Sequence, residues 1–205
     1  TVYKGSQLPE QVGSVLSQID RFTSCIILGW GSGGCDIEKE FGASKEFRDK
    51  AVDWVKHGGR FIVQGENVEY YGNWPEWFDK SWVSADYYRT DHVCNAKSDD
   101  DLHWCKWYHK AKGARIDSFY DGKSKCYNAK AVMLKGVAPE DVLFGTSSDS
   151  QSYSLVPHMA GMNVEEGLCI IALGKYGEGS VSFFGDVNGE EDTCAIMAVI
   201  ARGSQ

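Results

Sequence analysis

The sequence predicts one α/β domain, residues 1–205, built on an open and mainly parallel sheet with helices on both faces. The first observation is a helix–strand–helix–strand alternation over 8–65, which is typical of doubly wound sheets. The second is a C-terminal strand hairpin followed by a helix that can pack on the same sheet. The third is the length, because 205 residues suit a single domain with a full hydrophobic core.

The N-terminal half carries the alternation. Apolar residues recur at helical spacing over 8–20, and the run TSCIILGW at 23–30 predicts a buried parallel strand. Ser44 is expected to cap the next helix, which should end at the glycines 58–59 because a helix C-terminus favours glycine. The apolar run RFIVQG at 60–65 then predicts a second central strand.

The C-terminal third gives the clearest local signal. The stretch AKAVMLKGV at 129–137 predicts a strand. Two apolar runs joined by KYGEG predict a hairpin across 167–186, since a short glycine-containing turn is typical of hairpins. Residues 188–203 have acids in the first turn, an apolar body and an arginine at the end, which predicts a helix docked on the sheet.

The middle of the chain, at about 67–128, differs in character and is interpreted as an elaborated insertion over the carboxyl ends of the strands. It holds five of the seven tryptophans, and SDDDLHWCKWYHK at 98–110 predicts a short helix within it. Interleaved charges, as in WPEWFDKSW, indicate amphipathic pieces that pack one face down, so most of the rings are expected to be buried. The alternative is an exposed aromatic surface for a partner or a sugar.

The composition excludes some classes of function. The formal net charge is -8, which disfavours general binding to nucleic acids or to anionic membranes. We expect no membrane span, because no apolar run approaches the ~20 residues that a span needs. No signal peptide or lipidation motif is visible, although the chain starts inside an expected element and an upstream segment could have been removed. The oligomeric state is not indicated.

The seven cysteines contain no CxxC pair, so zinc-ribbon and thioredoxin interpretations fail. The apolar surroundings of three of them predict small core residues: Cys25, Cys169 and Cys194. Three others lie in the polar middle, where a disulfide between two of them is left open: Cys94, Cys105 and Cys126. This usage favours a reducing compartment, the cytoplasm or an organelle interior, over secretion.

Two segments together resemble a known superfamily. AVDWVKHGGRFIVQGE at 51–66 resembles the helix–GG–strand step of the class I glutamine amidotransferase-like superfamily, and is closest to its trehalose-utilisation (ThuA-like) branch. IALGKYGEGSVSFFGDVNGEEDTCAIMAVIAR at 171–202 is similar to the last hairpin and helix of that superfamily. FTSCIILGWGSGG at 22–34 fits the preceding strand and glycine-rich loop, so the resemblance covers about half of the chain.

The resemblance implies a flavodoxin-like sheet with a functional cleft at the carboxyl ends of the strands. It also implies a catalytic elbow after the strand at 60–65, where amidotransferase members carry a cysteine. Here the elbow reads Val63-Gln64-Gly65-Glu66, in which no side chain can act as a thiolate. Glutamine hydrolysis by the mechanism of the superfamily is therefore not expected.

Three side chains remain as catalytic candidates. Glu66 follows a buried strand and could act as an acid or base, or it could cap the next helix or form an ion pair. Asp186 follows the last strand and could partner Glu66, or it could cap the terminal helix together with Asn188. His158 could approach the same cleft from the extended segment before it, or it could be a structural histidine.

Ligand-binding candidates lie in the two turns of the expected cleft. The glycine-rich loop GWGSGG, with Gly31, Ser32 and Gly33, could offer backbone N–H groups to a phosphate, but it lacks dinucleotide and P-loop spacing, and a plain loop is the alternative. Gln64 and Asn67 flank the elbow. No metal or cofactor is predicted, because His103 and His109 do not share a helical face.

Two functions follow from these residues. The first is a catalytically diverged domain that binds a small ligand or a protein partner, as the missing nucleophile and the aromatic middle indicate. The alternative is a hydrolase or lyase with an altered acid–base site centred on Glu66, which requires Glu66 to converge with Asp186 or His158 in one pocket.

Overall fold

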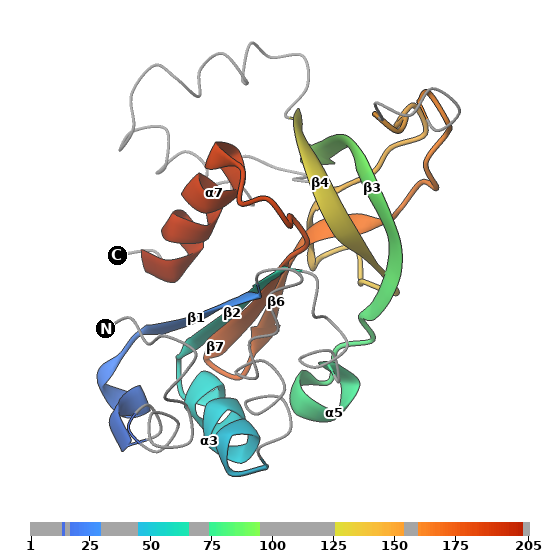
Figure 1. The fold of residues 1–205 in the computed structure, drawn as a ribbon. Helices are drawn as coiled ribbons and strands as arrows, with labels where there is room; N and C mark the ends of the chain where they lie inside the picture. The colour runs from blue at the N-terminus through green and yellow to red at the C-terminus, as the bar shows by residue number, and fades with distance from the viewer. Residues whose placement is uncertain are drawn as a thin grey trace.

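A computed structural model gives the structure of residues 14, 17–29, 45–65, 74–94, 126–153 and 160–202. These residues form a seven-stranded sheet in the order β1-β2-β7-β6-β4-β3-β5, in which β6 also pairs with β5. Figure 1 shows β1, β2 and β7 among the helices, with β3 and β4 curving away to one side.

The elements alternate between helix and strand early in the chain and become mostly strands later. In chain order they are η1 (Ile19–Arg21), β1 (Ser24–Gly29), α3 (Lys45–Lys56), β2 (Arg60–Gly65), α5 (Trp74–Phe78), β3 (Val83–Cys94), β4 (Cys126–Lys135), β5 (Val142–Gly145), β6 (Cys169–Tyr176), β7 (Gly179–Phe184) and α7 (Glu191–Arg202).

Most of the strongest local predictions are confirmed. The two apolar runs are β1 and β2, the helix after Ser44 is α3, and the hairpin and terminal helix are β6, β7 and α7. Of the helix expected at 8–20, residues 14, 17 and 18 are helical and Ile19 begins the 3-10 helix η1. The helix expected at 98–110 lies outside the described residues.

The parallel strands β2 and β7 are covered on both faces, as Figure 1 shows, whereas β1 lies at the edge of the sheet and its Ile26 is 43% exposed. Val63 of β2 packs in one apolar cluster with residues of α3 and α5, and Ile62 packs in another with Ile196 and Ile200 of α7. Neighbouring residues of a strand face opposite sides of the sheet. A strand buried on both sides must be apolar throughout, which is why its run of residues identified it.

The prediction of an open, mainly parallel, flavodoxin-like sheet is wrong. Among the described strands, only β1–β2 and β2–β7 pair in parallel, and all other pairings are antiparallel. β6, β4, β3 and β5 pair in turn, and β5 pairs back to β6, so these four strands close into a barrel. The sheet is therefore mostly antiparallel, and the described helices are few.

The error arises from β3 and β5, which no apolar pattern indicated. β3 is 12 residues long, yet Thr90 and His92 are its only buried residues. β5 has 4 residues, close to the shortest length that a strand has. β3 and α5 lie within 67–128, the segment predicted as an insertion, and β3 pairs with both β4 and β5 as part of the sheet.

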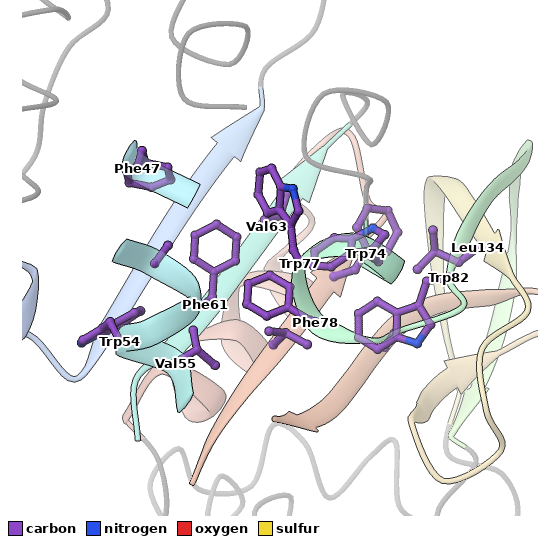
Figure 2. Packing of buried hydrophobic residues seen from close by; sticks show 14 of the residues in the cluster. Phe47, Trp54, Val55, Phe61, Val63, Trp74, Trp77, Phe78, Trp82 and Leu134 are labelled. Atoms are coloured by element: carbon purple, nitrogen blue, oxygen red, sulfur yellow. The ribbon is translucent and has the colours of Figure 1, made fainter. Parts of the chain in front are cut away.

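The aromatic residues of the middle segment fill the core where the structure describes them. Trp74, Trp77 and Trp82 are each at most 3% exposed, so the prediction that these rings are packed is confirmed. Figure 2 shows the rings of α5 gathered beside Phe61 of β2, and the centroids of Trp74 and Trp82 lie 5.1 Å apart. Trp30, Trp104 and Trp107 lie outside the described residues.

The cysteine predictions have mixed outcomes. Cys169 is buried in β6, as predicted, while Cys25 is half-buried. Cys194 is exposed, so its prediction as a core residue is wrong. The buried face of α7 carries Thr193, Ala195 and Ile196, and Cys194 points elsewhere and donates to the carbonyl of Gly189 at 3.5 Å. Cys105 lies outside the described residues.

Candidate functional site

Gln64 and Asp186 are the predicted site residues that the structure describes. The other candidates lie outside the described residues: Gly31, Ser32, Gly33, Glu66, Asn67 and His158. The convergence of Glu66 with Asp186 or His158 therefore stays a prediction.

Strand pairing brings Gln64 and Asp186 together. Gln64 lies opposite Phe184 in the parallel β2–β7 pair, one residue before β2 ends. The chain continues from β7 to Asp186, whose backbone pairs with Ala131 of β4. The amide nitrogen Nε2 of Gln64 donates to the carbonyl oxygen of Asp186 at 3.1 Å. The two residues thus meet at the carboxyl ends of the parallel strands.

The carboxylate of Asp186 is a structural acceptor. Its Oδ1 accepts the backbone N–H of Asn188 at 2.9 Å, and its Oδ2 accepts that of Glu190 at 2.6 Å. The side chain is 1% exposed, and its hydrogen bonds lower the pKa of Asp186 even though burial alone would raise it. Asp186 therefore holds the turn that leads into α7, which is the capping role considered as its alternative.

Glu190, which immediately precedes α7, forms the second half of the site. Its Oε1 accepts Nη2 of Arg89 at 2.6 Å and Nδ2 of Asn188 at 3.3 Å, while Nη1 of Arg89 donates to Oδ1 of Asn128 at 2.8 Å. Burial, followed by the hydrogen bond with Asp186, raises the pKa of Glu190, and Arg89 acts in the opposite direction. Asp186 and Glu190 are therefore a carboxyl pair in which the protonation of one group affects the other.

Several buried polar atoms in and near this pair have no hydrogen-bond partner of normal geometry in the described part of the chain. In the described part of the chain, Tyr127 Oη, Thr193 Oγ1, Glu190 Oε2 and both ring nitrogens of His92 are buried and make no hydrogen bond of normal geometry. Burial lowers the pKa of His92 to about 4, because the imidazolium would lose its hydration, although Asp91 and Asp186 oppose this shift. Burial likewise raises the pKa of Tyr127.

Sequence reasoning missed Arg89, His92, Tyr127 and Glu190. Arg89 and Glu190 are 101 residues apart, and they meet because the segment after β7 lies against β4, which in turn pairs with β3. No local sequence pattern predicts a contact between residues so far apart in the chain. The available signals were Asp186 at a strand end, predicted as a catalytic candidate or as a cap together with Asn188, and the acids at the start of the terminal helix.

The arrangement is better suited to holding the backbone than to proton transfer with a substrate. Both oxygens of Asp186 accept backbone N–H groups, Oε1 of Glu190 accepts Arg89, and Oε2 is buried. A general acid or base must reach the reacting atom of its substrate within hydrogen-bond distance. Within the described ranges, no group of three or more His, Cys, Asp or Glu side chains could hold a metal ion.

No protein-family model matches this chain, and no curated protein matches it. The resemblance of 51–66 and 171–202 to the amidotransferase-like superfamily therefore stays a hypothesis based on motifs. None of the described helices is long and apolar enough to cross a membrane. The interpretation of the site rests on its own geometry.

Proposed function

We propose that this chain is a binding domain whose ligand occupies the edge of the sheet where β1, β2 and β7 end. The observation that carries the proposal is the engagement of Asp186, because each of its two carboxylate oxygens accepts a backbone N–H and thereby holds the turn before α7. Ligands of α/β sheets bind outside the carboxyl ends of parallel strands, and Gln64 and Asp186 lie at that edge.

A small molecule is favoured over a protein partner. The partner interpretation depended on exposed tryptophans, but Trp74, Trp77 and Trp82 are buried against the sheet. Buried rings stabilise the core and cannot dock a partner. The described residues therefore lack the tryptophan-rich surface that a partner would recognise.

The alternative function, a hydrolase or lyase centred on Glu66, receives no support from the described residues. Its required partner Asp186 is engaged by backbone N–H groups, and Glu66 and His158 lie outside the description. The experiment below therefore tests this hydrolase or lyase hypothesis against the binding proposal.

The test combines turnover with binding. The purified protein is assayed with p-nitrophenyl acetate, γ-glutamyl-p-nitroanilide and p-nitrophenyl glycosides, and its Tm is measured with a panel of small polar molecules that includes L-glutamine. We expect no turnover above the buffer rate and a Tm increase with at least one compound. The Tm increase should shrink in Gln64→Ala, which loses a side chain at the proposed edge.

Turnover by the wild type that disappears in Glu66→Gln, with an unchanged circular dichroism spectrum, would contradict the proposal and establish the hydrolase. The matched control is Glu166→Gln, at an exposed residue far from the end of β2 in the sequence.

A further inference from the structure

The joint between α7 and the β3–β4 pair depends on a short stretch after β7. Val132 N donates to the carbonyl of Gly185, and Val187 N donates to that of Lys130, both at 2.9 Å. This pairing places Asp186 against β4, and four residues later the chain reaches Glu190 at the start of α7. Any change at these two carboxyl groups therefore acts directly on the attachment of α7.

One carboxyl oxygen of the pair, Oε2 of Glu190, has no hydrogen-bond donor in the part of the chain that the structure describes. Oε1 of Glu190 accepts Arg89 and Asn188, and both oxygens of Asp186 accept backbone N–H groups. Oε2 of Glu190 is buried and receives no donor from the described residues. A buried anionic oxygen without a donor is costly, whereas a protonated Oε2 is a donor, and the side chain of Asp186 is within hydrogen-bonding reach of the Glu190 side chain.

Two buried hydroxyls lie near the pair. Tyr127, which is 4% exposed, and Thr193, which is fully buried, have hydroxyl oxygens without hydrogen bonds in the described structure. The charges of Asp186 and Glu190 both act on Tyr127, and Thr193 lies beside the carboxylate of Asp186. The side of the pair that faces these hydroxyls is therefore buried and unfavourable to a second negative charge, while the side chains of Arg89 and Glu190 stay partly exposed.

The charge balance leads to the same conclusion. From β3, Arg89 supplies one positive charge to the pair, and His92 is neutral at pH 7 because of its burial; Asp91 acts on His92. From β4, Lys130 lies over the Tyr87 ring, with its Nζ 5.2 Å from the centroid. From α7, burial and then the charges of Asp186 and Glu190 raise the pKa of the Cys194 thiol, and Glu191 and Asp192 lie in the first turn. Arg89 forms an ion pair with Glu190, and a proton shared by the two carboxyl groups removes the second negative charge beside that ion pair.

We infer that Asp186 and Glu190 share one proton, and that this proton fastens the start of α7 to β3 and β4 so that the joint loosens when the pH rises. This inference is independent of the proposed ligand. A cation between the carboxylates fits less well, because Arg89 already contacts Oε1 of Glu190 and the described residues offer no metal-binding group.

The sign of the pH dependence follows from the direction of each shift. The pKa of Glu190 is raised above its ordinary 4.5, so its contribution to stability is complete below that value and is lost as the pH rises through the raised pKa. The pKa of Asp186 is lowered below 3.8, so its contribution is present above that value and is lost as the pH falls through the lowered pKa. The joint is tightest between the two transitions.

The experiment follows both carboxyl groups and the two amides that bind Asp186. Carbon-13 NMR of the side-chain carboxyls is recorded against pH in the full chain, together with hydrogen exchange at Asn188 N and Glu190 N. We expect Glu190 to titrate above 4.5 and Asp186 below 3.8. The equilibrium constant for local opening is obtained by dividing the measured exchange rate by the intrinsic rate. It should increase by up to about tenfold per pH unit between the pKa of Glu190 in the opened joint and its pKa in the closed joint.

Glu190→Gln tests whether the titratable proton itself is responsible. The glutamine amide has a donor and an acceptor like the protonated carboxyl group, but it does not titrate. The variant should keep both amides protected and abolish the pH dependence of their opening, while Glu166→Gln, at an exposed site, should behave like the wild type. A Glu190 carboxyl that titrates at or below 4.5 in the folded wild type overturns the inference, even if the variant fails to fold. An unchanged slope in Glu190→Gln, or a shift of the carboxyl signals by Ca²⁺ or Mg²⁺ at constant pH, also overturns it.

Discussion

The parallel strands and the four-strand barrel (β3, β4, β5 and β6) differ in the side chains that they bury. β2 buries an almost entirely apolar run between α3 and α7. The barrel strand β3 instead buries only the polar Thr90 and His92, and its neighbour β4 buries the hydroxyl of Tyr127 among apolar side chains. The hydroxyl of Thr90 donates to the carbonyl of Gln151, whereas the polar groups of His92 and Tyr127 lack hydrogen bonds among the described residues.

This difference separates what stabilises the molecule from what responds to its surroundings. Apolar burial in the parallel half is insensitive to pH and depends on packing. Buried titratable groups in the barrel and at its joint with α7 change their charge with pH. We therefore expect mutations in the first region to change stability at every pH, and mutations in the second to change its pH dependence.

The largest expected effect is that of Trp74→Ala, in the core of the parallel half. Trp74 is fully buried against Phe183 and Trp82, so its removal leaves a cavity that should cost about 3–5 kcal/mol of unfolding free energy. Urea unfolding at several pH values should show the same loss throughout. Tyr87→Ala, at a ring 43% exposed, is the control and should change stability by less than about 1 kcal/mol. A loss that varied strongly with pH would contradict the distinction.

The next effect is a pH dependence carried by His92 in the barrel. His92 takes up a proton below pH 6.5 in the unfolded chain but only near pH 4 in the folded chain. The free energy of unfolding therefore decreases as the pH is lowered from 6.5 to 4. The shift corresponds to about 3 kcal/mol at pH 4. His92→Phe should remove this fall in urea unfolding at pH 7 and pH 4, whereas His57→Phe, at an exposed histidine, should retain it. An equal fall in both variants would refute the role of His92.

The smallest of the three effects concerns the joint. Asp186→Asn replaces one acceptor oxygen with an amide group that cannot accept the backbone N–H of Asn188 or Glu190. A buried donor left unsatisfied costs about 1–3 kcal/mol, and we expect a loss of that size in urea unfolding at pH 7. Asp86→Asn, at an exposed residue of β3, is the matched control. If the two variants were equally stable, the anchoring role of Asp186 would have to be abandoned.

The elements predicted correctly from sequence are those whose identity is local. β2 is an apolar run between two glycine signals, and the β6–β7 hairpin is marked by its turn at Gly177. That glycine has a φ of +57°, and an added Cβ would meet the carbonyl oxygen of Lys56 at 2.5 Å, so the turn requires glycine for two reasons. Such constraints appear in the sequence because they concern a few adjacent residues.

The candidate site could be predicted only in part, since Asp186 was identified and its partners were not. Glu190 was read as a first-turn acid of the terminal helix, and nothing near Arg89 indicated a contact with it. A half-exposed antiparallel strand such as β3 can be identified only from the strands with which it pairs. Its pairing register decides which of its residues are buried.

The sequence alone therefore determined the strands that are apolar on both faces, the helices that cover them and the C-terminal hairpin. It also determined that Asp186 lies at the end of a strand. The tertiary structure alone decided that the sheet closes into a barrel rather than staying open, and that Glu190 meets Arg89 next to Asp186. The physical reason is range. Periodicity and turn chemistry act over a few residues, whereas barrel closure and a buried charge cluster are set by contacts between segments about 40–100 residues apart.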